Sequence, residues 1–194
     1  MTDNKLSIRM ATPSDAKELL SIYAPYVKKT AITFEYQVPS EEEFKRRISH
    51  TLERYPYLTA SKDGVIIGYA YVSPFRERAA YGWAVETSVY VAENSCGTGC
   101  GTQLYEVLEH ILKMQHIINA YACITFPNPG SIAFHQNFGY KTIGHFTNCG
   151  YKLNSWWDMI WMEKMLGEHS NPPLPVIPVG ELNLPQDLTL LCNS

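Results

Sequence analysis

Apolar positions along the chain change their spacing several times, and each change predicts a new secondary-structure element. A strand is predicted over residues 6–10. The three-and-four spacing that follows is typical of a helix with one buried face, from a cap at Thr12-Pro13 to about Lys28. Ser40 begins a second capping box, which predicts another helix through Phe44 and Ile48.

The middle and the end of the chain alternate between β-rich and helical patterns. The predicted strands are residues 57–62, 65–74, 82–91, 120–126, 141–151 and 156–165, and the predicted helices begin at Gly99 and at Ser131, the second ending at Phe138. Asp63-Gly64 is a hairpin signal between the first two of these strands. The order β-α-α-β-β-β-α-β-α-β-β mixes hairpins with helical crossovers, so we expect an α/β (α+β) fold with a mixed sheet.

Residues 1–166 are predicted to form one domain, and residues 167–194 a proline-rich tail. The tail has prolines at 172, 173, 175, 178 and 185, which oppose regular helix and central strand. Composition favours a flexible or surface-bound tail, and leaves open an arm that binds a partner.

Composition excludes several classes of function. The 194 residues are 45% hydrophobic, enough for a core, and a net charge of −3 gives no basic face for nucleic acid. No run approaches the roughly 20 apolar residues of a membrane span, and the start has no apolar leader, so we expect a cytoplasmic protein that does not bind a membrane. The five cysteines lack metal-ligand spacing, so we expect free thiols and no metal site.

A glycine-rich loop follows the strand that ends at Val91, in the order Cys96-Gly97-Thr98-Gly99-Cys100-Gly101. The absence of a lysine between Ala92 and Leu112 excludes a Walker loop, and the spacing and position argue against a dinucleotide fold. The remaining interpretations are an anion cradle at a helix N-terminus and an ordinary tight turn. Three alternate glycines favour the cradle.

This loop resembles the motif of the GNAT superfamily of acyl-CoA-dependent N-acetyltransferases, Arg/Gln-x-x-Gly-x-Gly/Ala. The phosphinothricin N-acetyltransferase group is the most similar, through "IYAPYVKKTAITFEYQVPSEEEFKRRI", "GYAYVSPFRERAAYGWAVETSVYV", "GTGCGTQLYEVL", "PNPGSIAFHQNFGYKTIG" and "GYKLNSWWDMIWM", in that order over residues 6–166. Cys96 stands where the family has Arg or Gln. We therefore expect the loss of one side-chain contact to the cofactor, about 1.5 to 3 kcal/mol.

The resemblance implies a mostly antiparallel sheet of about seven strands, splayed at a cleft for acetyl-CoA, the co-substrate. It implies main-chain contacts from Val89, Tyr90 and Val91, with a bulge near Val89 or Tyr90 that aims an N–H at the oxyanion. Its cofactor residues are Gly97, Thr98, Gly99, Cys100, Gly101, Thr102 and Asn128. The Asn128 segment is alternatively a simple turn.

Two residues are candidates for proton transfer. Glu86 shares a strand face with Ser88 and Tyr90, and a carboxylate there is costly unless it is paired or functional. It is either the base that deprotonates the amine, directly or through a water, or the partner of Arg76 or Arg78. The resemblance favours the base. His135 is either an acid or alternative base, or a structural histidine.

The acceptor substrate is expected at residues that the same resemblance highlights. They are Phe34, Glu35, Tyr36, Arg76, Arg78 and Tyr81. The two arginines suit bidentate binding of a carboxylate or phosphinate, although a solvated strand edge explains them equally well. Trp156, Trp157 and Trp161 are interpreted as sheet core.

The leading hypothesis is acetyl transfer from acetyl-CoA to the primary amine of a small amino acid or analogue, such as phosphinothricin, methionine sulfone or methionine sulfoximine. The alternatives are a protein N-terminal or polyamine acetyltransferase, and a non-catalytic acyl-CoA-binding module suggested by Cys96. A homodimer is expected from the resemblance only.

Overall fold

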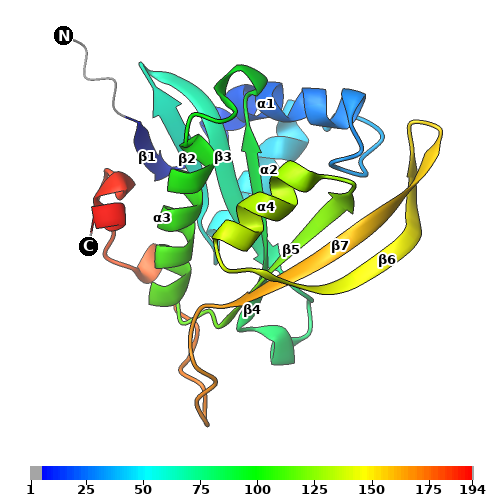
Figure 1. The fold of residues 1–194 in the computed structure, drawn as a ribbon. Coiled ribbons are helices and arrows are strands. Elements are labelled where there is room, and N and C mark those ends of the chain that lie inside the picture. Colours follow the sequence, from blue (N-terminus) through cyan, green and yellow to red (C-terminus); the bar gives the residue numbers. More distant parts are fainter. Residues whose placement is uncertain (1–5, 194) are drawn as a thin grey trace.

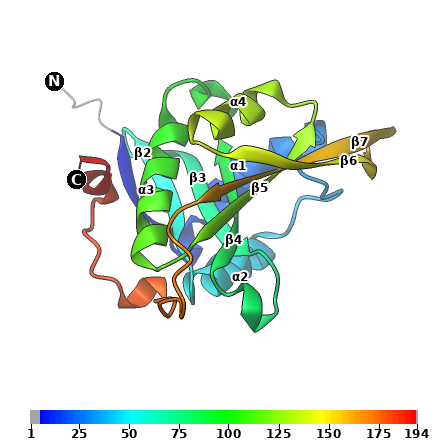
Figure 2. The ribbon, with the colours of Figure 1, turned by 60° about the horizontal axis from the view of Figure 1, so that its bottom comes forward.

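The computed structural model describes residues 6–193, in which one seven-stranded sheet lies between two layers of helices (Figure 1). Helices α1 and α2 cover one face of the sheet, and α3 and α4 cover the other (Figures 1 and 2). The helices are α1 (Ala16–Lys29), α2 (Glu41–Leu52), α3 (Cys100–Met114) and α4 (Pro129–Asn137). The strands are β1 (Ser7–Met10), β2 (Tyr57–Lys62), β3 (Val65–Pro74), β4 (Ala84–Val91), β5 (Asn119–Phe126), β6 (Lys141–Lys152) and β7 (Ser155–Met165).

The strand order is β1-β2-β3-β4-β5-β7-β6, and every neighbouring pair is antiparallel except β4 and β5. The predicted mixed, mostly antiparallel sheet of seven strands is therefore confirmed. The predicted order of helices and strands is also confirmed, with small shifts at their ends. The third long strand begins at Ala84 and not at Gly82, because Gly82 closes a 3₁₀ turn over Ala79–Tyr81.

Local signals explain where the helices begin. The Ser40 hydroxyl accepts a hydrogen bond from the N–H of Glu43, as in a capping box. Asp15 accepts hydrogen bonds from the N–H and hydroxyl of Thr12 and from Arg9, and so closes the turn before α1. Asp63 and Gly64 have φ values of 51° and 78°, the left-handed pair that a two-residue hairpin requires.

The sheet separates two cores. On the α3 face, the core includes Leu104, Leu108, Ile111 and Met162. On the α1 and α2 face, it contains several tyrosines, of which Tyr57, Tyr69 and Tyr71 stack on one another. The interpretation of Trp156 as sheet core is wrong, because 62% of its surface is exposed near the tip of the β6–β7 hairpin.

The segment after Leu166 lies on the body of the protein, beside α3 and β1 (Figure 1). Val179 and Leu188 are buried in the core on the α3 face. The side-chain amide of Gln115 donates to Ile177 O, and the Trp83 ring N–H donates to Leu174 O. Within residues 6–193, this segment is therefore bound to the surface rather than extended from it.

No helix in the described part of the chain is both long and apolar enough to span a bilayer, and the side chains of residues 6–191 include no cluster of three potential metal ligands. Cys96, Cys100, Cys123 and Cys149 are free thiols. The expectations for the Cys192 side chain and for residues 1–5 lie outside what the structure describes.

Candidate active site

The glycine loop joins β4 to α3 and adopts a conformation that requires glycine. Gly97 and Gly99 have φ values of 76° and 85°, in the left-handed region that side chains rarely adopt. Gly99 is the N-cap of α3, whose first N–H groups have no partner within the helix. A Cβ at Gly97 or Gly99 would meet no atom within 4 Å, so the space over the loop is open. A helix N-terminus of this kind favours a bound anion.

A cleft of about 690 Å³ begins at this loop and follows β4. Seven of the predicted cofactor residues line it, namely Val89, Val91, Gly97, Gly99, Gly101, Thr102 and Asn128. Its other lining residues, for which the sequence gives no functional signal, are Tyr26, Ile32, Ser131 and Phe134. The size and the open glycine cradle fit an elongated phosphorylated cofactor.

The remaining predicted cofactor residues have other contacts. The Thr98 hydroxyl donates to Ser95 O at 2.7 Å. Cys100 is buried, with its sulfur against Gly68. The Tyr90 ring packs on the opposite face of the sheet, against Tyr23, Tyr26 and Tyr69.

Cys96 is exposed and lines the cleft as well as a neighbouring cavity of about 570 Å³. Lys29 of α1 lines that second cavity. This lysine is a cation close to the position where the family has Arg or Gln.

The cleft deepens where β4 and β5 diverge. These strands pair only over Ala84–Glu86 and Asn119–Tyr121, so the β5-facing edge of β4 leaves the sheet ladder after Glu86. Pairing of β4 with β3 is regular up to Val91, and the predicted bulge near Val89 or Tyr90 is therefore wrong. Divergence of two parallel strands, and not a bulge, makes the main chain accessible.

A smaller cavity of about 70 Å³ occupies this divergence. It shares Ile32, Val89, Asn128 and Ser131 with the cleft and so continues it. Its other lining residues include Thr87, Ser88, Tyr90, Tyr105, Cys123 and His135.

Asn128 has a structural role as well as a place in the cleft. Its side-chain oxygen accepts a hydrogen bond of 3.2 Å from Ser131 N and caps α4, with Pro129 at the first helical position. Asn128 therefore begins α4 and is not part of a simple turn, and it borders both the cleft and the small cavity.

Glu86 lies at the last paired position of β4 and β5, opposite Tyr121. It is partly buried, and no hydrogen bond or ion pair joins its side-chain carboxylate to Arg76, Arg78 or any other described residue. Burial raises its pKa, and the charge of Arg76 acts in the opposite direction without a direct contact. The ion-pair interpretation is therefore not supported, and the carboxylate is free to accept a proton.

His135 is buried in α4 and hydrogen-bonded through both ring nitrogens. Nδ1 lies 2.7 Å from Ser131 O, and Nε2 lies 2.8 Å from the Tyr105 hydroxyl. Burial lowers the pKa of His135, so it favours the neutral ring. The ring borders the small cavity.

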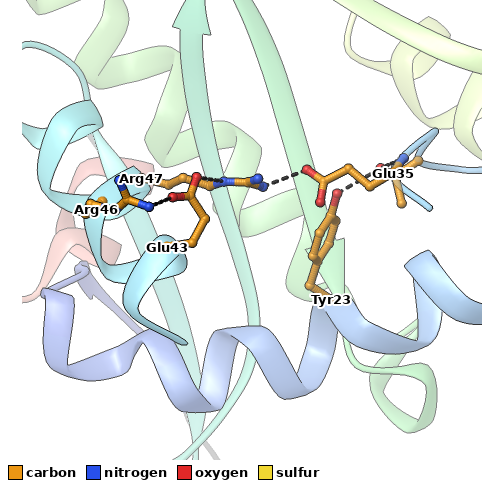
Figure 3. Close-up of polar contacts among 6 residues, drawn as sticks. Tyr23, Glu35, Glu43, Arg46 and Arg47 are labelled. Carbon is orange, nitrogen blue, oxygen red and sulfur yellow. Dashed lines mark hydrogen bonds and ion pairs between the residues drawn. The ribbon is translucent and has the colours of Figure 1, made fainter. Parts of the chain in front are cut away.

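The predicted acceptor residues lie in two separate groups. Phe34, Glu35 and Tyr36 belong to the loop between α1 and α2, which packs on the β6–β7 hairpin through Phe34 against Gly150 and the Tyr36 hydroxyl on Tyr151 O. Glu35 forms an ion pair of 2.6 Å with Arg47 of α2, which also binds Glu43 (Figure 3). Arg47 was not identified from the sequence, where it reads as one of several charges on an exposed helix face.

The second group follows β3. The Arg76 guanidinium lies 4.4 Å from the Phe75 ring centroid and 5.7 Å from that of Trp161. Tyr81 packs edge-on against Phe75 and lines a cavity of about 270 Å³ with residues of the C-terminal segment. Arg78 caps the 3₁₀ turn, and its side chain makes no hydrogen bond, ion pair or ring contact within the described chain. None of the cavities described here includes residues of both groups.

Tyr71 and Ser88 lie between Glu86 and the Glu35–Arg47 pair, on the face of the sheet covered by α1 and α2. They are paired in register, and the charges of Glu86, Glu35 and Arg47 all act on the pKa of Tyr71, which burial raises. A polar path thus leads from Glu86 toward the Glu35–Arg47 pair. The alternation of side chains along β3 places Tyr71 on the same face as Tyr69, but the sequence did not reveal that Tyr71 pairs with Ser88 of β4.

Comparison with known proteins agrees with this geometry. Residues 8–161 match the family described as Acetyltransferase (GNAT) domain. A phosphinothricin N-acetyltransferase of Streptomyces coelicolor is 35% identical over 84% of this chain and 97% of its own length. An L-methionine sulfoximine/L-methionine sulfone acetyltransferase of Salmonella typhimurium is 28% identical over 86% of this chain and 98% of its own length.

A solved structure gives the same result. The crystal structure of a GNAT superfamily phosphinothricin acetyltransferase from Sinorhizobium meliloti in complex with AcCoA has a TM-score of 0.83 and 32% identity, and covers 88% of this chain and 93% of that one. An open glycine cradle, a cleft along a diverging β4 and an unpaired glutamate at the last paired position of β4 thus coincide with a family match over most of the chain. The chain belongs to the GNAT acetyltransferase family and is an enzyme that transfers an acetyl group from acetyl-CoA to an amine.

Proposed function

We propose that the acceptor is the primary amine of a small amino acid or amino-acid analogue, such as phosphinothricin, methionine sulfone or methionine sulfoximine, which attacks directly in a ternary complex. The names of the relatives support this substrate class. The observation that carries the proposal is the continuous path from the glycine loop along β4 to Thr87, the residue next to Glu86, where pairing with β5 ends.

In this proposal, the N-terminus of α3 and the loop of Gly97, Gly99 and Gly101 hold the diphosphate of acetyl-CoA. The cofactor supplies an activated acetyl thioester when bound. The β5-facing main chain of Val89 and Val91 holds the extended arm as an added strand would, and Asn128 borders the same path.

Glu86 acts as the base. An amine with a pKa near 10 must lose a proton before it attacks, and a carboxylate without a cationic partner is available for that step. Direct contact and one intervening water are both compatible with its position next to Thr87, where the path ends.

Arg76 is the candidate for binding an acceptor carboxylate. Its charge acts on Glu86, and no carboxylate among the described residues pairs with it. Rings of Phe75 and Trp161 limit its movement, which lowers the entropic cost of binding. Glu35, Phe34 and Tyr36 would border the acceptor from the other side.

The test is release of free CoA thiol from acetyl-CoA with a panel of amino acids, the three analogues, polyamines and peptides. Glu86→Gln should lower kcat by roughly 10²–10⁴ and leave CoA affinity unchanged. Glu106→Gln, the same change on the exposed side of α3, is the matched control and should have no effect. Turnover of polyamines or peptides alone would contradict the substrate class. CoA binding without thiol release for any amine would indicate a binding module.

We also propose a homodimer, supported by exposed apolar side chains on and beside the β6–β7 hairpin. These are Ile143, Phe146, Tyr151, Leu153 and Trp156. Light scattering coupled to size exclusion should give about twice the 22.0 kDa mass, and Trp156→Ser should reduce it. A monomeric wild type would refute the dimer. A cytoplasmic location stays a prediction.

A further inference from the structure

A chain of hydrogen bonds crosses the interior between β4, α3 and α4, and joins three buried side chains. The Thr87 hydroxyl donates to Tyr121 O at 3.0 Å, and the Tyr105 hydroxyl donates to Thr87 Oγ1 at 2.8 Å. Tyr105 is also 2.8 Å from His135 Nε2, and His135 Nδ1 is 2.7 Å from Ser131 O. The chain therefore ends at the carbonyl oxygens of Tyr121 and Ser131, which can only accept, and the Ser131 hydroxyl lies farther from Nδ1, at 3.5 Å.

These four contacts need four protons. Each hydroxyl has one, and both are committed toward Tyr121 O, so the contact between Tyr105 and His135 needs a proton on Nε2. The contact with Ser131 O needs another on Nδ1. Only the doubly protonated ring satisfies all four contacts.

Burial of the His135 ring disfavours this doubly protonated, charged form. It lowers the pKa of His135 from 6.5, so the neutral ring with one proton prevails at rest. The ionisable groups around this ring are the phenols of Tyr105 and Tyr140, and the carboxylates of Glu86 and Glu109 act on Tyr105. The resting chain thus has three protons for four contacts.

Any one of the four hydrogen-bond contacts can be the one that lacks a proton. If Nδ1 keeps its proton for Ser131 O, Tyr105 turns its hydroxyl toward Nε2 and Thr87 turns its own toward Tyr105. Thr87 Oγ1 is then able to accept a proton. Thr87 lines the small cavity at the divergence of β4 and β5, where the path of the proposed cofactor ends.

We propose that Thr87, Tyr105 and His135 form a proton relay that takes one proton from a group in this cavity and returns it to another. This inference rests on the proposed function for the identity of those groups. As the amide bond forms, the amine nitrogen loses a proton to Thr87 Oγ1. Thr87 passes its own proton to Tyr105, and Tyr105 passes its own to His135 Nε2. The reverse sequence returns the proton to the departing CoA sulfur, so the relay ends unchanged. Glu86, from the other face of the sheet, removes the first proton of the ammonium.

Nitrogen NMR of histidine-labelled protein, without any ligand, tests the hydrogen-bond chain itself. The neutral His135 ring should carry its proton on Nδ1. Tyr105→Phe keeps the ring packing and removes the Nε2 hydrogen bond from both protonation states. Because the bond donated by the charged ring is the stronger of the two, the pKa of His135 should fall by about one. Tyr140→Phe is the matched control, because its ring also lies beside His135 but its hydroxyl forms no hydrogen bond with that ring. That variant should leave the pKa of His135 unchanged. A proton on Nε2 in the neutral ring, or an unchanged pKa in Tyr105→Phe, would overturn the relay.

Kinetics then tests whether the chain ends at Thr87. Thr87→Val should lower kcat by about 10²-fold with CoA affinity retained, and Thr87→Ser should restore most of it. A Thr87→Val enzyme with unchanged kcat would overturn the relay. If the wild type releases no thiol with any amine of the panel, the proposed function fails. The NMR result still decides whether the hydrogen-bond chain exists.

Discussion

Gly68 and Cys100 meet where β3 passes beneath the start of α3, and their contact can be tested by a double-mutant cycle. A Cβ at position 68 would lie 2.9 Å from Cys100 Sγ, 3.2 Å from Tyr90 O and 3.3 Å from Leu104 Cδ1. Because Cys100 is only 2% exposed and Leu104 is fully buried, the new methyl cannot be accommodated without movement. Overpacking of this kind costs about 1–3 kcal/mol, which is the expected loss for Gly68→Ala.

Cys100→Ala alone should cost about 1 kcal/mol, because it removes one buried heavy atom. In the double variant, the methyl group introduced at position 68 occupies the space that the sulfur leaves. The double variant should therefore be about 1–2 kcal/mol more stable than the sum of the single changes predicts. The contacts with Tyr90 O and Leu104 remain, so compensation should be incomplete.

The assay is urea unfolding followed by tryptophan fluorescence for the wild type and three variants, with CoA affinity measured by calorimetry. Cys100→Ala should change the Kd for CoA by less than about threefold, since its side chain does not line the cleft. Stability changes that add to within about 0.5 kcal/mol would refute the packing argument. A large loss of CoA affinity in Cys100→Ala would instead support a direct cofactor contact for this residue.

Three further predictions follow from single groups. Asp15→Asn should destabilise by about 1–2 kcal/mol at pH 7 through loss of the turn before α1; since Arg9 holds the pKa of Asp15 below 3.8, urea unfolding should show that the difference from wild type narrows as the pH falls below 3.8, and a constant difference would contradict this. Thr59→Val should be neutral or stabilising in thermal unfolding because its buried hydroxyl has no partner in the described chain, so a loss above about 1 kcal/mol would count against it. Burial raises the pKa of Glu86 above 4.5, so kcat/KM should fall as the pH falls through that higher value, and Glu86→Gln should lack this acidic limb. The variant should be at least as stable as the wild type at pH 7, because ionised Glu86 destabilises the folded state above its raised pKa. An acidic limb that persists in Glu86→Gln would point to another base.

Local signals in the sequence determined the order of the elements. Caps at Thr12 and Ser40, the Asp63-Gly64 turn and the change between helical and strand spacing act over a few residues, so they can be recognised without knowledge of the fold. The glycine loop belongs to the same class, because its left-handed φ values depend on residue type at that position. The expected seven-stranded sheet also followed from the resemblance.

Tertiary structure decided how distant segments meet. The sequence placed Glu86, Thr87 and His135 on their elements, but not the divergence of β4 from β5 that replaces the expected bulge. It did not reveal that Tyr105 joins Thr87 to His135, because these residues are 18 and 30 positions apart and only the packing of α3 and α4 on one face brings them together. The Glu35–Arg47 pair and the docking of the described residues after Leu166 have the same origin. Each of these contacts depends on which apolar surfaces of the sheet are covered by which segments. Hydrophobic burial is not directional, so the sequence alone does not specify which distant segment covers a given surface.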